Sequence, residues 1–532
     1  MMRRPVRLTL RIWGLMALLG AALLLPRPDS TAHAESFFLA HAFFAPNPDV
    51  YGRAAFGYSL AAVGNNIAIG AVEDDTATID GGAVYLFDGA TGTLLRTFLD
   101  PTPEIFEGFG IGMATLGDNV LIGSPQDDIA GTNTGTVYLF DASAGSILRT
   151  FTNPTPAGND GFGARIAALG DDLIVSAWAD DTAGEDAGAA YLLDGVSGQL
   201  LQTFLNPAPG PPDYAGGDSF GSSLAVLGTN VVISAQLDDA GATNAGSVYL
   251  MDPASGDIIQ TFSNPSPSFN DQFGTAVATL GDDVIIGAPL DDTGASNTGS
   301  AYLFDGTTGA LMHTFLNPTP GASDQFGVAM TVVGANVVIG AIQDDTAGTD
   351  AGAAYLFSPD GTLLRTFLNP TPVDDHEGGF AVDEFGYPLA AFGDDVLISA
   401  PFDDTLATDA GAVYLFEAVP PGDTDGDGCT DKSEVLTVPG SEGSGGRRDP
   451  NNPWDYFNPT KDGANRGDDI TAVIMNYGQD QGEPGSTYSV NYDRAPLPGA
   501  NPWQFGPPDG RIRGFEITAI VNSYGHDCRA AP

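Results

Sequence analysis

Short apolar runs separated by polar turn residues recur along the chain with a period of 53 to 59 residues. In the best-kept repeat the runs are Val277–Leu280, Val284–Ala288, Ala301–Phe304 and Leu311–Leu316. They are too short for helices, are rich in Val, Ile, Tyr and Phe, and indicate β-strands. They also lack strict polar alternation, as expected of strands that neighbouring sheets cover on both faces. Each repeat is therefore predicted to form one four-stranded sheet.

A Phe-Gly pair opens every repeat. It occurs seven times, at Phe56-Gly57, Phe109-Gly110, Phe162-Gly163, Phe220-Gly221, Phe273-Gly274, Phe326-Gly327 and Phe385-Gly386. Repeats of this length are typical of solenoids, arrays or propellers. Because four-stranded sheets repeated radially make a propeller, we predict a mainly β fold, a seven-bladed β-propeller over residues 35–418.

The seventh repeat lacks its fourth strand, since Ala412–Phe416 is soon followed by Pro420-Pro421. The missing strand is found near the start of the chain, where residues 39–48 (LAHAFFAPNP) match residues 363–372 (LLRTFLNPTP). The N-terminal strand is thus predicted to complete the last blade and to close the ring. Closure removes the exposed edges that an open sheet would offer for aggregation.

Residues 1–34 have the pattern of a signal peptide. Four arginines precede an apolar run over residues 13–25, and Ala32-His33-Ala34 offers a small-x-small cleavage site. The run is too short to span a bilayer, and no other stretch of the chain is long and apolar enough. We expect a secreted or extracellular protein, free or associated with a cell surface, with no membrane span.

The chain is strongly acidic, with 68 Asp and Glu against 19 Lys and Arg and a formal net charge of −49. Such a surface makes nucleic acid an unsuitable partner. The charge fits a role in solubility, and it fits equally the binding of cations or of basic partners.

Acidic residues repeat with the blades. An Asp pair follows each second strand, at Asp74-Asp75, Asp127-Asp128, Asp180-Asp181, Asp238-Asp239, Asp291-Asp292, Asp344-Asp345 and Asp403-Asp404. Six repeats carry another acid two residues before the Phe, at Glu107, Asp160, Asp218, Asp271, Asp324 and Asp383. Antiparallel connectivity places both sets on one face of the ring. Two interpretations stay open: side chains that bond the backbone of their own turns, or an acidic recognition face for an extracellular protein or glycan, with bound divalent ions.

Other repeated positions have an architectural interpretation. The small pairs that end each second strand, such as Gly287-Ala288, are predicted to permit close approach near the narrow part of the ring. The tyrosine of each third strand is expected to pack between blades. Two insertions, at residues 209–217 and 374–384, interrupt the repeat on the acidic face, and loops of this kind usually carry binding. His376 lies in the second, and a lone loop histidine is weak evidence for catalysis.

The Phe-Gly opening, Gly287-Ala288-Pro289 and the closing Gly-x-x-Tyr-Leu-Phe at residues 299–304 resemble the FG-GAP repeats of integrin α-subunit propellers and their bacterial relatives. The likeness covers residues 37–418 and implies a seven-bladed propeller whose ligands approach the acidic face. Integrin blades often hold calcium in an Asp-x-Asp-x-Asp-Gly loop between strands one and two. Here that link is as short as Gly281-Asp282-Asp283, so the resemblance does not extend to calcium inside the ring.

A calcium loop is predicted just after the repeats, within residues 419–450. A twelve-residue stretch starting at Asp423 has the EF-hand spacing, with Gly428 at position 6. Its ligands would be Asp423, Asp425, Asp427, the backbone carbonyl of Cys429, Asp431 and Glu434. A solvated acidic linker would explain neither the glycine nor the terminal glutamate.

Residues 451–532 contain two matching units, each with a loop followed by a short amphipathic helix that ends at Gly, and together they resemble the duplicated dockerin module. The first unit supplies a weaker calcium set, Asn458, Thr460, Asp462 and Asp469, but has Arg466 at position 9. The second retains only Asp509 and Glu516. The positions that dockerins use for partner choice differ here, so a protein partner for this module is left open.

Both cysteines, Cys429 and Cys528, lie in this C-terminal part, and an even pair in an exported chain predicts one disulfide.

Three functions remain from the sequence. The first is a calcium-binding, non-catalytic binding or adhesion protein, with the ring as recognition platform and the tail as attachment module. The second is a secreted polysaccharide-degrading enzyme with a dockerin-like tail, although the five histidines are scattered and the carboxylates repeat by blade instead of forming one distinct pair. The third is a structural surface-array component.

Overall fold

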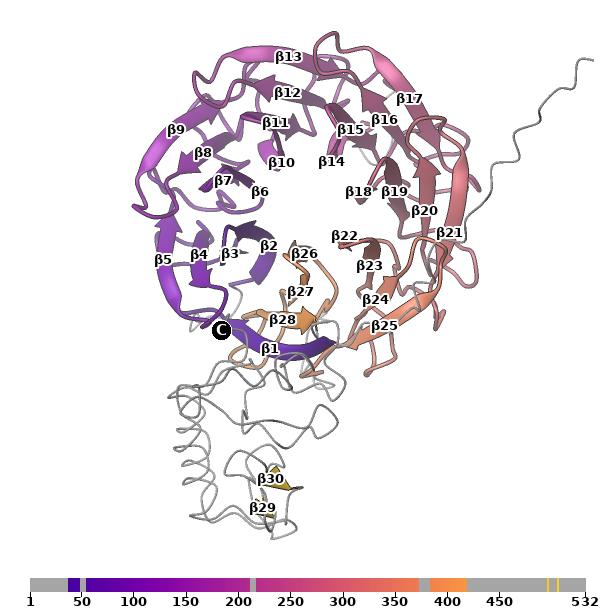
Figure 1. Ribbon diagram of the computed structural model, residues 1–532. Helices are drawn as coiled ribbons and strands as arrows, with labels where there is room; N and C mark the ends of the chain where they lie inside the picture. The colour runs from indigo at the N-terminus through magenta and orange to yellow at the C-terminus, as the bar shows by residue number, and fades with distance from the viewer. Residues whose placement is uncertain are drawn as a thin grey trace, which may run out of the picture. The chain divides into compact units, whose positions relative to one another are not determined.

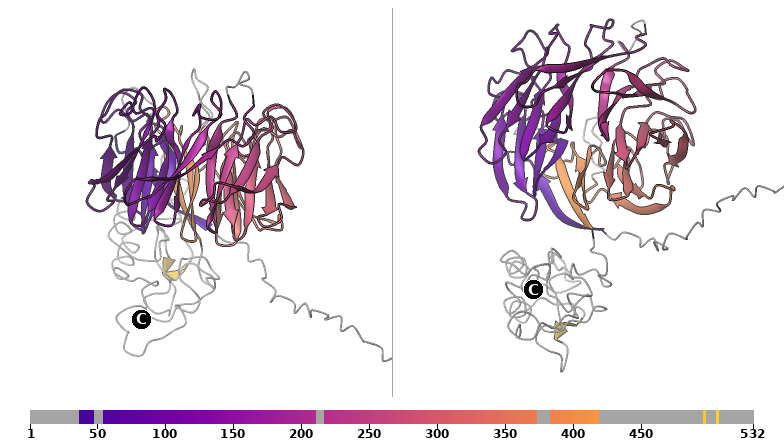
Figure 2. Two further views of the ribbon diagram at one scale, coloured as in Figure 1. Left: turned by 90° about the horizontal axis from the view of Figure 1, so that it is seen from above. Right: turned by 45° about the horizontal axis from the view of Figure 1, so that its top comes forward.

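Seven four-stranded antiparallel sheets are arranged as the blades of a ring (Figure 1). The structure is a computed structural model, and it describes residues 37–47, 54–210, 217–372 and 383–418, together with two short strands, β29 (Ala495–Pro496) and β30 (Phe505–Gly506). The strands of the ring run between its two faces (Figure 2). Among the described residues, no helix is long and apolar enough to cross a membrane.

Each of the first six blades is continuous in sequence, and the first strand of each blade lies innermost (Figure 1). Blade one holds β2 (Phe56–Val63), β3 (Asn66–Ala71), β4 (Ala83–Asp88) and β5 (Leu94–Leu99); blade two holds β6 (Met113–Leu116), β7 (Asn119–Ser124), β8 (Thr136–Phe140) and β9 (Ile147–Thr152); blade three holds β10 (Phe162–Leu169), β11 (Asp172–Ala177), β12 (Ala189–Leu193) and β13 (Leu200–Leu205). Blade four holds β14 (Phe220–Leu227), β15 (Asn230–Ala235), β16 (Ser247–Met251) and β17 (Ile258–Ser263); blade five holds β18 (Val277–Leu280), β19 (Asp283–Ala288), β20 (Ser300–Asp305) and β21 (Leu311–Leu316); blade six holds β22 (Met330–Val333), β23 (Asn336–Ala341), β24 (Ala353–Phe357) and β25 (Leu363–Leu368).

The seventh blade is built from both ends of the ring. Its strands β26 (Leu389–Phe392), β27 (Asp395–Ala400) and β28 (Ala412–Ala418) are completed by β1 (Phe37–Phe44). In Figure 1 indigo β1 lies beside orange β28, and the two strands pair antiparallel from Phe37 opposite Ala418 to Phe44 opposite Ala412. The prediction that the N-terminal strand closes the ring is confirmed.

The burial of the strands explains the pattern in the sequence. The second and third strands of every blade are buried on both faces, which accounts for their unbroken apolar runs. The fourth strands of blades one to six are exposed or half-buried except for one phenylalanine each, such as Phe98 or Phe151, whereas β1 in blade seven buries Phe37 and Phe43. The hydrophobic cores lie between blades. In one of them Leu121 and Phe151 of blade two pack with Phe162 and Tyr191 of blade three. The mainly β, seven-bladed prediction therefore holds strand by strand.

Each Phe-Gly pair joins two neighbouring blades. All seven phenylalanines are fully buried, and all seven glycines have φ between 95° and 112°, a backbone region that favours glycine. The glycine at the end of a second strand faces the Phe-Gly glycine of the next blade, so that a Cβ added to Gly123 would lie 2.0 Å from the carbonyl oxygen of Gly163. Four blades have glycine at this position, and blades three, four and seven have Ser176, Ser234 and Ser399, so the close approach of backbones keeps the residue small.

A second glycine contact, between the glycine before each third strand and the Phe carbonyl of the next blade, recurs at the point of closure. A Cβ on Gly82 of blade one would meet the Phe109 carbonyl at 2.3 Å, and a Cβ on Gly411 of blade seven would meet the Phe56 carbonyl at 2.2 Å. The amide of Phe56 donates to the carbonyl of Ala410 at 3.1 Å. Blade seven therefore joins blade one through the contact that joins the other blades.

Candidate functional site

We call the connection face the side of the ring that carries the links from each second to third strand and from each fourth strand to the next blade. The Asp pairs lie here, and the first member of every pair is buried. Its Oδ1 accepts the backbone N–H two residues later at 2.7–2.8 Å. Its Oδ2 accepts the hydroxyl of the third-strand tyrosine at 2.5–3.0 Å. These seven carboxylates hold the loop and the tyrosine in place.

The second member of each pair shapes the same loop. Its Oδ1 accepts the backbone N–H five residues later at 2.6–2.9 Å. The donating residue is Asp or Asn in every blade and has φ between 48° and 54°, which Asn and Asp tolerate better than other side chains. The interpretation of the Asp pairs as turn residues is confirmed.

The acids before the Phe are also internal. Five of them are aspartates that accept a hydrogen bond at 2.6–2.8 Å from the side-chain amide of an asparagine at the end of the preceding fourth strand. Burial, assisted by the nearby Asp pair, raises the pKa of Asp160 to about 6, and burial likewise raises that of Asp324 to about 6. Of the acidic positions predicted for a recognition face, only the second members of the pairs reach solvent to a substantial degree.

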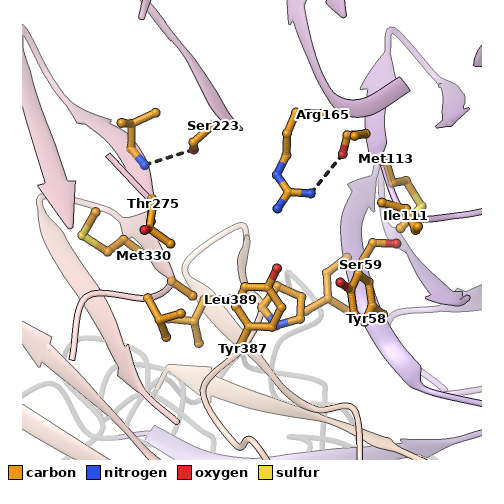
Figure 3. A pocket seen from close by; sticks show the side chains of 18 of the residues that line it. Tyr58, Ser59, Ile111, Met113, Arg165, Ser223, Thr275, Met330, Tyr387 and Leu389 are labelled. Carbon is orange, nitrogen blue, oxygen red and sulfur yellow. Dashed lines mark hydrogen bonds between the residues drawn. The ribbon is translucent and has the colours of Figure 1, made fainter. Parts of the chain in front are cut away.

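A cavity of about 580 Å³ opens on the connection face at the mouth of the central channel. It is lined by residues that directly precede or follow the Phe-Gly pairs and by residues that follow the second strands, among them Tyr58, Arg165, Trp178, Gln236, Gln272, Glu384 and Tyr387. An adjoining cavity of about 200 Å³ shares Tyr58, Arg165 and Tyr387 and continues among the innermost strands, where Met113, Met330 and Leu389 line it (Figure 3).

Arg165 is the only cation among the described residues that line these cavities. It lies on β10, and Figure 3 shows its guanidinium reaching into the cavity from the strand. Nε donates to the Ser222 carbonyl at 3.1 Å and Nη1 to the Ala164 carbonyl at 3.0 Å. Because guanidinium has five N–H donors in a rigid fork, this anchoring leaves donors for a ligand.

Two aromatic rings and one carboxyl stand across the cavity from Arg165. Tyr58 and Tyr387, from adjoining blades one and seven, meet edge to face with ring centroids 6.2 Å apart. Burial, together with the Tyr387 hydroxyl, raises the pKa of Tyr58, and Arg165 opposes this shift. Burial also raises the pKa of Glu384 to about 7. The cavity thus combines an anchored cation, two phenol rings and one carboxyl that takes up a proton near neutral pH.

Trp178 also lines a third cavity on the same face. This third cavity, of about 330 Å³, lies over blades two and three and is lined by Gln126, Asn133, Asn159 and Asp186. The Trp178 side chain is 42% exposed although it is a large apolar group. An exposed indole flanked by amides and a carboxylate is a surface on which a polar ring can stack while its edges form hydrogen bonds.

Comparison of the repeats with each other could have identified these residues. Two positions after the Phe-Gly pair the seven blades carry Ser59, Gly112, Arg165, Ser223, Ala276, Ala329 and Pro388, so Arg165 is the one large charged residue. After the small pair that ends the second strand they carry Val72, Pro125, Trp178, Gln236, Pro289, Ile342 and Pro401. The repeated motifs are what the blades share, whereas the cavity is lined by residues at positions where the blades differ.

The metal and disulfide residues predicted from the sequence lie outside the described residues. This holds for the loop at Asp423, Asp425, Asp427, Cys429, Asp431 and Glu434, for the set Asn458, Thr460, Asp462 and Asp469, and for Cys528. It also holds for His376 and for the signal peptide over residues 1–34. Those predictions stand as they were made.

The FG-GAP repeat family matches six segments of the chain, residues 47–87, 150–193, 210–251, 265–304, 319–357 and 377–416. Blade two, with β6–β9, lies between the first two matched segments and repeats the same strand order. No curated protein matches the chain.

Proposed function

We propose that this chain, whose FG-GAP repeats form a seven-bladed β-propeller, is an exported, non-catalytic binding protein that recognises a glycan at the channel mouth of its connection face. The observation that carries the proposal is the placement of Trp178, exposed between two cavities and surrounded by amides. Sugar rings present apolar faces to aromatic side chains and hydroxyls to amides, and both are provided here.

Arg165 favours an acidic sugar. Its anchored guanidinium can bind a carboxylate or sulfate oxygen through charge-assisted hydrogen bonds. The rest of the molecule is strongly acidic, so the field around the ring repels a long polyanion. A neutral chain with one acidic residue fits both facts, since only that residue need enter the cavity beside Arg165.

The enzyme hypothesis meets a specific obstacle in the cavity. Glycoside hydrolysis normally uses two carboxyl groups on either side of the scissile bond. Among the described residues that line the cavity at the channel mouth, Glu384 is the one carboxyl group. Its raised pKa suits a general acid, yet no described residue of the lining supplies the second group. Binding is therefore the function that the cavity supports best.

The test is binding of soluble oligosaccharides, neutral and uronic acid-containing, to the full chain by calorimetry. Trp178→Ala is expected to weaken binding of both kinds by about tenfold to a hundredfold, the usual cost of truncating a central aromatic contact. Arg165→Gln is expected to weaken only the acidic ligands, by a similar factor.

Phe269→Ala is the matched control. Phe269 is 74% exposed, lies in a link of the same face between β17 and β18, and lines neither cavity beside Trp178. Equal loss in Trp178→Ala and Phe269→Ala would contradict a site at Trp178. Release of shortened sugars would support the enzyme hypothesis, and no retention of any glycan would favour the structural role.

We further propose that the C-terminal part binds calcium and serves for attachment to a partner or a surface. The EF-hand spacing from Asp423 to Glu434 supports this proposal. Glu434→Gln removes the usual bidentate ligand and is expected to abolish calcium binding at that loop, measured as the loss of one bound ion by native mass spectrometry. An unchanged number of bound calcium ions would refute calcium binding at this loop.

A further inference from the structure

Blade two departs from the other blades at one buried group. In blades three to seven an asparagine at the end of the preceding fourth strand donates its side-chain amide to the acid before the Phe, as Asn153 does to Asp160 at 2.7 Å. In blade two the asparagine is replaced by Asp100, and the acid is Glu107, one carbon longer. An amide donor is therefore lost and a second carboxyl group takes its place.

A third carboxylate completes the group. Asp127, the first member of the Asp pair of blade two, lies beside Asp100 and Glu107, and one oxygen from each of the three lies within 4.8 Å of the others. All three side chains are buried, at 4%, 3% and 1% exposure for Asp100, Glu107 and Asp127. Two oxygens on opposite sides of one Ca²⁺ are separated by about 4.8 Å, because calcium–oxygen distances are about 2.4 Å. The three oxygens thus lie no farther apart than the width of one calcium coordination shell.

The hydrogen bonds of the group leave a buried oxygen of Asp100 for a ligand. Oδ1 of Asp100 accepts the Thr102 N–H at 2.8 Å, Oε2 of Glu107 accepts the Glu104 N–H at 2.8 Å, and both oxygens of Asp127 accept hydrogen bonds. Oδ2 of Asp100 is buried and has no hydrogen-bond partner. A buried carboxylate oxygen without a partner carries a large desolvation cost unless a cation or proton reaches it.

We propose that Asp100, Glu107 and Asp127 bind a calcium ion at the junction of blades one and two. Three hard oxygen donors held by short loops match the ligand preference of Ca²⁺. Asp100 directly follows β5 of blade one, whereas Glu107 precedes β6 and Asp127 follows β7 of blade two. The ion would therefore connect the outer strand of one blade to the loops of the next. The site differs from the strand-one to strand-two loops, which are two-residue turns here.

Protons are the competing occupant. Burial, together with the neighbouring carboxylates, raises the pKa of Glu107 to about 7. Burial and the neighbouring Asp127 also raise the pKa of Asp100, whereas the hydrogen bond from the Thr102 N–H lowers it. Calcium must displace whatever protons the group holds.

The test is the number of Ca²⁺ ions bound by the full chain, measured by native mass spectrometry after exchange into calcium-containing buffer. Asp100→Asn restores the asparagine that five other blades carry, so folding should be retained. It is expected to remove one Ca²⁺ from the count and to reduce the rise in unfolding temperature that Ca²⁺ produces. Glu107→Gln is expected to have the same effect, and it serves as the second variant if the first folds poorly.

Asp160→Asn in blade three is the matched control, because it removes the equivalent acid where an asparagine stands in place of Asp100. It is expected to leave the calcium count unchanged. The two changes in blade two are repeated in the Glu434→Gln chain, so that ions of the proposed C-terminal loop are counted separately. If Asp100→Asn and Glu107→Gln both leave the number of bound Ca²⁺ ions unchanged, the proposal is wrong, and the three carboxylates share protons instead of a calcium ion.

Discussion

Phe43 is expected to be as important for stability as a core residue of a continuous blade, although it lies on a strand borrowed from the N-terminus. Its side chain is 3% exposed, and its ring packs against Phe87 with centroids 5.2 Å apart. It belongs to a cluster that also contains Phe56 of blade one and Val413 of blade seven. Truncation of a buried phenylalanine costs about 3–5 kcal/mol through lost burial and the remaining cavity. Phe43→Ala is therefore expected to lower the free energy of unfolding by about that amount.

The assay is urea unfolding followed by tyrosine and tryptophan fluorescence, with two comparison variants. Leu39→Ala lies on the same strand, but Leu39 is 42% exposed, so its expected cost is about 0.5 kcal/mol or less. Phe151→Ala removes the equivalent phenylalanine, 3% exposed, from β9 of blade two, and its expected cost equals that of Phe43→Ala.

The outcome that refutes the reasoning is a Phe43→Ala variant as stable as Leu39→Ala. It would mean that β1 is not part of the folded blade in solution, and that blade seven keeps β28 as an open edge. A cost similar to that of Phe151→Ala would show that the strand from the N-terminus is packed as firmly as a strand within a blade.

Three further changes test other contacts of the ring. Tyr191→Phe removes the hydroxyl that donates to Oδ2 of Asp180 at 2.5 Å, and it is expected to cost about 1–3 kcal/mol in urea unfolding. Gly123→Ala places a Cβ 2.0 Å from the Gly163 carbonyl, and it is expected to lower stability by about 1–3 kcal/mol or to prevent folding. The pKa of Asp160 is about 6 when folded against an ordinary 3.8, so its contribution to stability is fully present below pH 4 and is lost as the pH rises through 6. The unfolding free energy is expected to fall over that range at fixed ionic strength, and Asp160→Asn should flatten the fall.

Each of these has a result that would count against it. Wild-type stability in Tyr191→Phe would mean that the buried carboxylate does not depend on the tyrosine. Wild-type stability in Gly123→Ala would mean that the blades can separate without cost. A stability that stays level or rises between pH 4 and pH 7 would mean that the folded protein does not retain a proton on Asp160 over that range.

The fold was predictable because its physical causes are local and repeated. Apolar runs of strand length and turns at Gly and Asp determine the strands of each blade. The match between residues 39–48 and 363–372 indicates which segment closes the ring. The Asp pairs were left between two interpretations, since a turn residue and an exposed acidic ligand have the same sequence pattern. Only the hydrogen bonds of side chains such as Asp180 distinguish them.

The candidate sites were harder to predict because they depend on departures from the repeat. Arg165 and Trp178 lie on one hairpin of blade three, but the cavity that they line is completed by residues of other blades, such as Tyr58 and Glu384, which only the ring brings near them. The exchange of asparagine for Asp100 is a single change, and its importance depends on Glu107 and Asp127 being within reach. A position-by-position comparison of the seven repeats would have identified both the cavity residues and Asp100, whereas a search for shared motifs passes over positions that differ between blades.

The pairing of β1 with β28 has a consequence for how the polypeptide matures. Blade seven needs residues 37–44 and residues 412–418 at once, so the earliest strand to be synthesised stays without its partner until nearly the whole ring has been made. Contacts so distant in sequence form slowly, because the entropy of closing a very long loop precedes any gain. The ring therefore cannot close before residues 412–418 have been made, and β28 keeps an unpaired edge until β1 joins it.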